Sequence, residues 1–384
     1  MVNMGNGRTN VLVLGDGAAG IIISNKLRLL TDRERVSISI VGNTPLHYFK
    51  PDGIHIPLNL KNYRDSVKPT AFVINPGIEY IRDMATHIDP ENRKVTLLGG
   101  KTLDYDILIV ATGNRFAPDE IPGYRGSANH FYDLPSAIDL RDQLRKFKGG
   151  KIVIGQASIP IQCPPAPYEF TFQLEDYLRT RGIRDKTQID YVYPLNRVFT
   201  IANVSDEVQR LFDEKNINYH TLFNVESIDQ EKKQVNSLEG ETVDYDLLVM
   251  IPPHRGQRFI TESGLADESG YIDVDRHKLN YKDHDDLFAI GDATNLPISK
   301  AGATAHFESE YLANRLAYET SGHVYDESYN GEVACTTVTG EGTAMTLYFS
   351  YNKPPRAWYE SRFDYLLKWT SADTYFTAML RGIM

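Results

Sequence analysis

The sequence predicts an α/β fold of two domains, the second inserted into the first, followed by an amphipathic helical region. Short apolar, β-branched segments alternate with amphipathic ones along most of the 384 residues. This alternation is typical of βαβ units with parallel strands. A chain of this length also exceeds the usual size of a single core, so more than one domain is expected.

Composition excludes several classes of function. The net charge of −10 argues against a general nucleic-acid binder, because neutralising phosphates requires clustered Lys and Arg. No apolar run reaches the roughly 18 residues of a membrane span, and the first residues, MVNMGNGRTN, lack the apolar core of a secretory signal. Neither a spanning helix nor export is therefore expected. Two cysteines are too few for a disulfide scaffold.

The first βαβ unit carries a glycine fingerprint. A strand at 10–14 leads into GDGAAG at 15–20, then a helix at 21–30 and a second strand at 36–41. Such glycines allow a tight turn, close approach of a pyrophosphate and helix–strand packing, which predicts a Rossmann-like dinucleotide-binding domain. The acid expected after the second strand is missing, so Asn43 is the candidate ribose ligand. The other predicted contacts here are Gly15, Gly17, Ala18, Ala19 and Gly20.

The remaining elements define a second Rossmann-like domain inside the first. We predict an FAD-binding domain from 1–114 and 286–340, an inserted domain over 115–285, and a C-terminal region over 341–384. The run Lys148-Gly149-Gly150 is a plausible hinge. Further strands are predicted at 95–98, 107–111, 151–154, 189–193, 218–222, 247–251 and 287–290, with helices at 134–147, 170–181 and 205–216.

Two later motifs favour FAD as the bound dinucleotide. LIVATG at 108–113 and LFAIGDA at 287–293 resemble the two further FAD motifs of the disulfide reductase superfamily with two dinucleotide domains. In that superfamily the acid of the second motif, here Asp292, binds the ribityl chain. The resemblance implies FAD contacts at Ala111, Thr112, Gly113, Gly291, Asp292, Lys300 and Gly302.

The inserted domain lacks a second fingerprint. Its strand at 151–154 continues as GQASIP at 155–160, without two of the three glycines. Pro160 also removes a backbone N–H where a phosphate cradle needs donors. NAD(P)H is therefore not expected to be the electron donor.

In its place stands the run CPPAPYEF at 163–170. It resembles the active-site segment of the sulfide:quinone oxidoreductases and of the flavoprotein subunit of flavocytochrome c sulfide dehydrogenase. The resemblance extends to KAGATAH at 300–306, the region of Cys335 and an aromatic tail. It implies that Cys163 and Cys335 are a redox pair facing the flavin, whereas spacing alone favours two inert apolar thiols. Hydrosulfide would attack their disulfide, leaving a persulfide on one cysteine and a thiolate on the other.

Other residues of the site are weighed against ordinary structural roles. Glu169 is a candidate proton shuttle, the alternative being a solvated acid in a first helical turn. His130 and His306 are weaker candidates, because a lone histidine is more often structural. A third cysteine found in many relatives aligns with Tyr132, which predicts non-covalent FAD.

The tail combines aromatic and basic residues. It contains both tryptophans, Trp358 and Trp369, and on a helix Tyr359, Phe363, Leu366 and Leu367 share one face. With the resemblance, this predicts a peripheral, monotopic anchor on the cell membrane, on the cytoplasmic side by default. The alternative is a helix packed on its own core or in a homo-oligomer. Quinone contacts are predicted at Phe307, Phe349 and Tyr351.

The leading hypothesis is thus a sulfide:quinone oxidoreductase, an enzyme that oxidises hydrogen sulfide to sulfane sulfur through Cys163, Cys335 and FAD. Its partners would be hydrogen sulfide, a membrane quinone and the lipid bilayer surface, with no nucleic acid and no metal. The alternatives are a flavocytochrome c sulfide dehydrogenase flavoprotein, a type II NADH:quinone oxidoreductase, and a non-catalytic flavin redox sensor.

Overall fold

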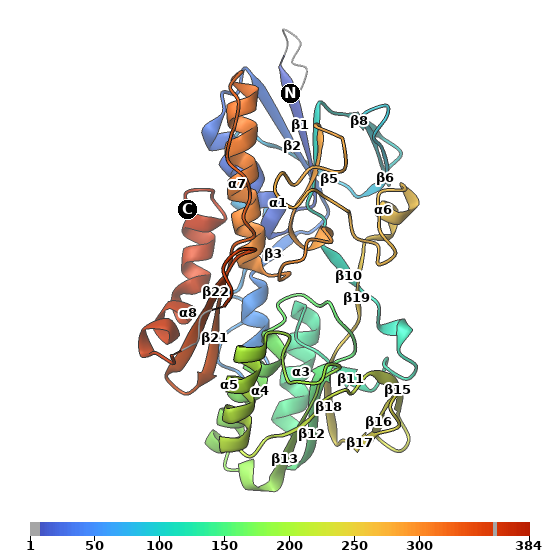
Figure 1. Cartoon of the computed structure of the whole chain (residues 1–384), viewed down its shortest axis with the longest axis vertical. Helices are drawn as coiled ribbons and strands as arrows, with labels where there is room; N and C mark the ends of the chain where they lie inside the picture. Colours follow the sequence, from blue (N-terminus) through green and yellow to red (C-terminus); the bar gives the residue numbers. More distant parts are fainter. Residues whose placement is uncertain (1–7, 356–358) are drawn as a thin grey trace.

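The computed structural model describes residues 8–355 and 359–384, and it contains two five-stranded parallel sheets. They lie one above the other in Figure 1, joined by a narrow connection. The first sheet has the order β20-β9-β1-β2-β5, with β1 (Thr9–Leu14), β2 (Val36–Gly42), β5 (Glu79–Arg82), β9 (Ile107–Val110) and β20 (Leu287–Ala289). The second has the order β11-β18-β12-β13-β14, with β11 (Ala128–Asn129), β12 (Gly150–Gln156), β13 (Thr187–Val192), β14 (Asn218–His220) and β18 (Leu247–Ile251).

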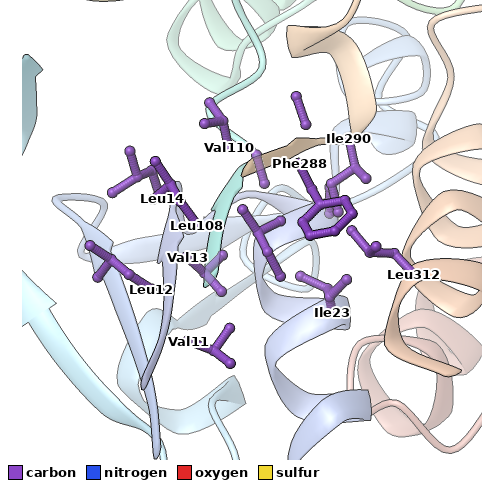
Figure 2. Close-up of a cluster of buried hydrophobic side chains, with 14 of the residues drawn as sticks. Val11, Leu12, Val13, Leu14, Ile23, Leu108, Val110, Phe288, Ile290 and Leu312 are labelled. Atoms are coloured by element: carbon purple, nitrogen blue, oxygen red, sulfur yellow. The ribbon is translucent and has the colours of Figure 1, made fainter. Parts of the chain in front are cut away.

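Helices α1 (Ala18–Leu30) and α7 (Gly302–Thr320) pack along each other against the first sheet. Their contact is apolar: Ile23 of α1 and Leu312 of α7 are fully buried and lie beside Phe288 of β20 (Figure 2). The strands of this sheet read as nearly continuous apolar runs because both of their faces are covered. The inserted domain has α3 (Leu134–Lys146), α4 (Ala166–Thr180) and α5 (Ala202–Glu214).

The helix at 170–181 is confirmed as α4, but it begins at Ala166. Pro167 lies in the first turn of this helix. Proline is well tolerated there, because the amide N–H has no intrahelical partner in the first turn. The helix at 205–216 likewise begins earlier, as α5.

Each domain also carries a three-stranded antiparallel meander immediately before a parallel strand that lies next to the central strand of its sheet. In the first domain this meander leads into β9, and in the inserted domain the matching one leads into β18. The two domains therefore share one arrangement. The meanders consist of β6 (Ala85–Asp89), β7 (Lys94–Leu97) and β8 (Thr102–Asp104), and of β15 (Val225–Asp229), β16 (Gln234–Ser237) and β17 (Thr242–Asp244).

The two domains are connected by an antiparallel ribbon of β10 (Asn114–Phe116) and β19 (His254–Gly256). The chain therefore returns to the first domain at β19, earlier than the predicted boundary at 285. The segment after β19 packs in the first core through Ile260 and Ile272, both fully buried. Its apolar residues are separated by turns, so their pattern did not reveal which core they join.

The C-terminal region is a hairpin followed by a helix. Strands β21 (Val333–Gly340) and β22 (Thr343–Phe349) pair with each other, so the predicted boundary at 340 divides one structural unit. After the hairpin come α8 (Arg362–Thr374) and the π-helix η5 (Tyr375–Met379). The hairpin lies between α4 and α8 (Figure 1). Short elements complete the fold: β3 (Leu46–Tyr48), η1 (Lys50–Ile54), β4 (Val67–Pro69), α2 (Thr70–Val73), η2 (Pro118–Glu120), η3 (Arg184–Lys186), α6 (Arg258–Glu262) and η4 (Gly291–Ala293).

Helix α8 turns its apolar side outward. Phe363 and Leu366 are 68% and 62% exposed, and Leu367 and the preceding Tyr359 are exposed as well. Lys368, on the opposite side, points toward the hairpin. Trp358 lies outside the described residues. Among the described helices, none is both long and apolar enough to cross a bilayer.

The core predicts a sharp contrast along α1. Ile23→Ala should lower the free energy of unfolding by about 2–5 kcal/mol, because it opens a cavity between the sheet and α7. Leu29→Ala, on the exposed end of the same helix, should change it by less than about 0.5 kcal/mol. Urea denaturation of both variants measures this, and equal losses would contradict the packing described.

Candidate active site

Three glycine turns that are far apart in sequence meet at the carboxyl ends of the first sheet. A Cβ atom added to Gly15 would lie 2.4 Å from the carbonyl oxygen of Ala111, and one added to Gly291 would lie 3.2 Å from the Cβ of Ala19. The fingerprint, the 108–113 motif and the 287–293 motif therefore line one place, as the sequence predicted. Ligands of open α/β sheets bind at this edge.

The N-terminus of α1 is open for an anion. Its N-cap, Gly17, has no side-chain cap, and its first turn has no acid. A Cβ added to Gly17 would meet nothing within 4 Å, whereas one on Gly20 would lie 1.8 Å from the carbonyl oxygen of Gly15. Gly15 also has a φ of +106°, which other residues rarely adopt. The free amides and the helix dipole fit a pyrophosphate.

Asp16 shapes the turn after β2. Its Oδ2 accepts hydrogen bonds from the Thr44 amide and the Tyr80 hydroxyl, both at 2.9 Å. Its carboxyl also occupies the space that a Cβ on Gly42 would need. Asn43 stands exposed beside this turn, at the end of β2, where a ribose ligand is expected.

The second motif is tied to the inserted domain by a polar chain. The Gln162 amide donates to Oδ2 of Asp292 at 2.5 Å, and Lys50 Nζ donates to Oε1 of Gln162 at 3.3 Å. Burial lowers the pKa of Lys50, and Asp292 opposes this shift. Sequence reasoning missed Lys50 and Gln162, because Lys50 begins the short 3₁₀ helix η1, Gln162 lies in a loop, and neither has a motif of its own.

Lys300 connects this motif to the first cysteine. Its Nζ lies 3.9 Å from the ring centroid of Tyr271 and donates to the carbonyl of Thr294. Its own carbonyl oxygen accepts the Cys163 amide at 2.5 Å. Burial lowers the pKa of Lys300, and Asp292 opposes that shift. Gly302 begins α7, whose N-terminus also has no side-chain cap.

The residues of this cleft fit FAD, a cofactor whose two phosphates need an uncapped helix N-terminus. Polar atoms at the junction of the two domains support the fit. Thr112 Oγ1, both amide atoms of Asn114 and Nε2 of His254 are buried and have no partner among the described residues. Such groups are normally paired, so a bound polar molecule accounts for them.

The fold brings Cys163 and Cys335 together as free thiols. Cys163 lies just before α4 with a φ of +42°, and its carbonyl oxygen accepts the Tyr132 hydroxyl at 3.3 Å. Cys335 lies on β21. Both side chains are half-buried and pack against the core of the inserted domain. They are close enough that charge on Cys335 opposes ionisation of Cys163.

Glu169 is not a solvated helix acid: it is 1% exposed and paired with a lysine from α8. Lys368 Nζ lies 3.0 Å from Oε1 of Glu169 and 3.2 Å from Oε2. Oε1 also accepts the Val338 amide at 3.1 Å, and Lys368 donates to the Thr336 carbonyl at 2.8 Å. Strand β21, which carries Cys335, is thereby held from both sides. Sequence reasoning missed Lys368, because a lysine on the polar side of a helix carries no local signal of burial.

These neighbours act on the thiols in opposite directions. Burial raises the pKa of Cys335 to about 11, with Lys368 lowering it and Glu169 raising it. Burial also raises the pKa of Cys163, and Lys368 again opposes the shift. The pKa of Glu169 is raised by burial and lowered by Lys368. Burial alone would lower the pKa of Lys368, but Glu169 and the two cysteines together outweigh it, so the pKa is raised and the lysine keeps its charge.

The weaker candidates are scattered. His130 lies between Phe116 and Ser136, and His306 lies on α7 beside Phe307; no contact joins either to the cysteines. Burial lowers the pKa of both histidines. The structure does not group the three predicted quinone contacts: Phe349 packs against the core of the inserted domain, as the cysteines do, but Phe307 and Tyr351 pack against the first core.

A different aromatic pair stands near the ion pair. The imidazole of His55 stacks on Trp369 with centroids 4.8 Å apart, and its Nδ1 lies 2.8 Å from Oε1 of Gln173. Burial lowers the pKa of His55 to about 3, so this ring is neutral.

Comparisons with known proteins agree with this geometry. The family described as pyridine nucleotide-disulphide oxidoreductase matches residues 9–309. The chain is 29% identical to the mitochondrial sulfide:quinone oxidoreductase of Mus musculus, over 90% of this chain and 79% of that protein. It is 27% identical to the Dictyostelium discoideum protein of the same name, over 97% and 86%. The crystal structure of the Aquifex aeolicus sulfide:quinone oxidoreductase superimposes with a TM-score of 0.85 at 22% identity, covering 97% of this chain and 92% of that one.

Glu308, which is buried behind the second motif, predicts a pH-dependent stability. Its Oε2 accepts the Gly291 amide at 2.5 Å, and burial raises its pKa to about 8. The unfolded carboxyl ionises near pH 4, so the native state loses stability as pH rises from there through about 8. Glu308→Gln should therefore match the wild type at about pH 4 and exceed it by roughly 1–3 kcal/mol at about pH 9. Urea denaturation at both pH values measures this, and a difference that stayed constant with pH would refute it.

Proposed function

The chain belongs to the pyridine nucleotide-disulphide oxidoreductase family and is an FAD-dependent oxidoreductase; from this premise we propose that it is a sulfide:quinone oxidoreductase. The observation that carries the proposal is the pair of free thiols, Cys163 and Cys335, placed beside the FAD motifs by the Cys163–Lys300 contact. The relatives named sulfide:quinone oxidoreductase support the same reaction.

The oxidised pair is the form that accepts substrate. Hydrosulfide attacks one sulfur of the Cys163–Cys335 disulfide, the S–S bond breaks, and the products are a persulfide and a thiolate. A second hydrosulfide takes the outer sulfur of the persulfide and leaves as a disulfide ion, so that both cysteines are thiolates. Bound FAD would supply the acceptor for the two electrons released when these thiolates re-form the disulfide, and quinone would take up these electrons. Each sulfide oxidised yields one two-electron reduction of quinone to quinol.

Lys368 and Glu169 favour the thiolate form of the cysteine that leaves when the disulfide breaks. Both thiols lie in surroundings that oppose ionisation, and the ammonium of Lys368 is the cation that offsets this. Glu169 holds the ammonium through both of its oxygens and can itself carry a proton, because burial raises the pKa of its carboxyl. We infer that this pair stabilises the thiolate and moves protons between sulfur and quinone.

A type II NADH:quinone oxidoreductase is the main alternative within the family. It would need a phosphate cradle after β12, but residues 157–165 separate that strand from α4. The first turn of α4 then carries Pro167, which has no amide N–H, and the acid Glu169. Because both features disfavour a bound phosphate, we expect NADH to be a poor donor.

The outward apolar side of α8 supports a lipid-borne acceptor. Phe363 and Leu366 offer an interfacial face, while Lys368 reaches the active site from the same helix. We propose peripheral attachment through this face, on the cytoplasmic side, with quinone arriving along α8 near Trp369 and Phe349. A haem protein as acceptor, as in flavocytochrome c sulfide dehydrogenase, would make no use of such a face.

The proposal predicts the response of the flavin. Under anaerobic conditions, micromolar sulfide should bleach the flavin absorption, NADH should not, and a short-chain quinone should restore it. Cys163→Ser and Cys335→Ser should each lower the rate of bleaching by at least about a hundredfold, because either change removes the disulfide. Flavin content serves as the control for folding. Bleaching by NADH alone would refute the proposal, and bleaching without reoxidation by quinone would indicate a redox sensor.

The ion pair predicts a shifted thiol titration. Lys368→Met removes the nearby cation, so the pKa of Cys335 should rise by about one unit from its value near 11. At a fixed pH below that value, alkylation of the reduced holoenzyme by iodoacetamide should slow by about tenfold. In the double variant Glu169→Gln/Lys368→Met both side chains are neutral. It tests whether the slower alkylation of Lys368→Met comes from the buried Glu169 that this variant leaves without a partner.

Lys61→Met is the matched control, because Lys61 donates to the carbonyl of Trp369 on α8 at 3.2 Å without touching Glu169. It should leave the alkylation profile unchanged. Equal shifts in the two variants would show that Lys368 acts only through the helix.

A further inference from the structure

A cationic groove of about 560 Å³ lies where the end of α1 meets the end of the C-terminal helix. Arg381 and Ile383 line the groove close to the C-terminus, which Figure 1 shows at the end of the helical segment that begins with α8. Arg28 and Arg33 line it from α1 and the loop that follows, and Arg381 lines it from the residues after η5. Asn75 adds an amide whose Nδ2 donates to the carbonyl of Arg381 at 3.1 Å.

None of these three arginines forms an ion pair with another described residue, although the protein carries a net charge of −10. Arg28 is 6% exposed, donates to the carbonyls of Val36 and Thr31 at 2.9 and 2.8 Å, and has an Nε without a partner. Arg33 donates to the Pro76 carbonyl at 2.6 Å. Backbone carbonyls therefore orient these guanidinium groups without neutralising them.

Most of the charges that act on Arg28 are positive. Burial lowers the pKa of Arg28, and the charges of Arg33 and Arg8 lower it further, with Asp32 the one opposing carboxylate among these influences. Clustered guanidinium groups with free donors match the oxygens of a phosphate.

The rim of the groove is apolar, and this favours a lipid over a free phosphate as the ligand. Leu29 and Ile383 line the groove and are 57% and 66% exposed. Phe72, beneath the Arg381 guanidinium at 5.2 Å, is 66% exposed. Thr377 of η5 also lines the groove, and Lys68 lies over the ring of the preceding residue, Phe376. An anionic headgroup flanked by acyl chains fits this combination of charge and apolar rim.

We propose that this groove is a binding site for the phosphate headgroup of an anionic phospholipid. The site would anchor one end of the C-terminal helix while the face of α8 enters the interface. The inference rests on the proposed membrane attachment and adds to it a specific lipid class and the arginines that select it.

The test compares vesicles of phosphatidylcholine alone with an equal mixture of phosphatidylcholine and phosphatidylglycerol, using flotation of the holoenzyme. Wild-type protein should bind the anionic vesicles more tightly. The double variant Arg33→Gln/Arg381→Gln should lose about 30-fold of that affinity, because each charge near an anionic surface contributes about fivefold. Its binding to neutral vesicles and its bleaching by sulfide should stay unchanged.

The matched control is Arg125→Gln/Arg210→Gln, which removes the same charge from the surface of the inserted domain. An equal loss in this control would overturn the site, because only general charge would then matter. If the groove variant also lost binding to neutral vesicles, the arginines would contribute to membrane attachment in general, and a headgroup-specific site would be overturned. If the wild type bound neither kind of vesicle, the membrane attachment and the lipid site would be overturned together. Inorganic phosphate that raises the Tm of wild type but not of the groove variant, without any preference for anionic vesicles, would reassign the groove to a free phosphate.

Discussion

The buried ion pair between Glu169 and Lys368 is the interaction on which the geometry of the redox site depends. It joins helix α4 of the inserted domain to helix α8 at the end of the chain, and both partners also bind the backbone of β21 between them. A buried pair of this kind is costly to break, because either partner alone would be an uncompensated charge. It therefore fixes Cys335 opposite Cys163, two residues that no local element connects.

The same pair reconciles two demands on the thiols. A dry site protects a persulfide from solvent, but burial also raises the pKa of both cysteines and suppresses the reactive thiolate. A single ammonium within the site offsets part of that penalty while remaining charged itself, because Glu169 and the two cysteines together outweigh its own desolvation. The reactivity of the two thiols thus depends on α8, a helix that has no fully buried side chain.

Helix α8 has different surroundings on its two sides. Its polar side enters the active site, and its apolar side is exposed together with residues around the arginine groove. This is the reverse of an ordinary surface helix, whose apolar stripe faces the core. Such an arrangement places an exposed apolar face and the lysine that pairs with Glu169 on one helix, so the proposed attachment to a bilayer would be coupled to the geometry of the thiol pair.

Local patterns in the sequence predict the parallel α/β fold, the glycine turns of the first domain and an apolar face on the last helix, because an alternation, a glycine spacing and a helical period can each be read without tertiary contacts. Cys163, Cys335 and Glu169 became candidates through resemblance to a family. The direction of the apolar face, the return of the chain at β19, the pairing of β21 with β22 and the contacts of Lys50, Gln162 and Lys368 emerge only in the folded chain. They depend on contacts between segments distant in sequence, because a lysine in a short 3₁₀ helix or on a polar helix face has no local signature until another element closes over it.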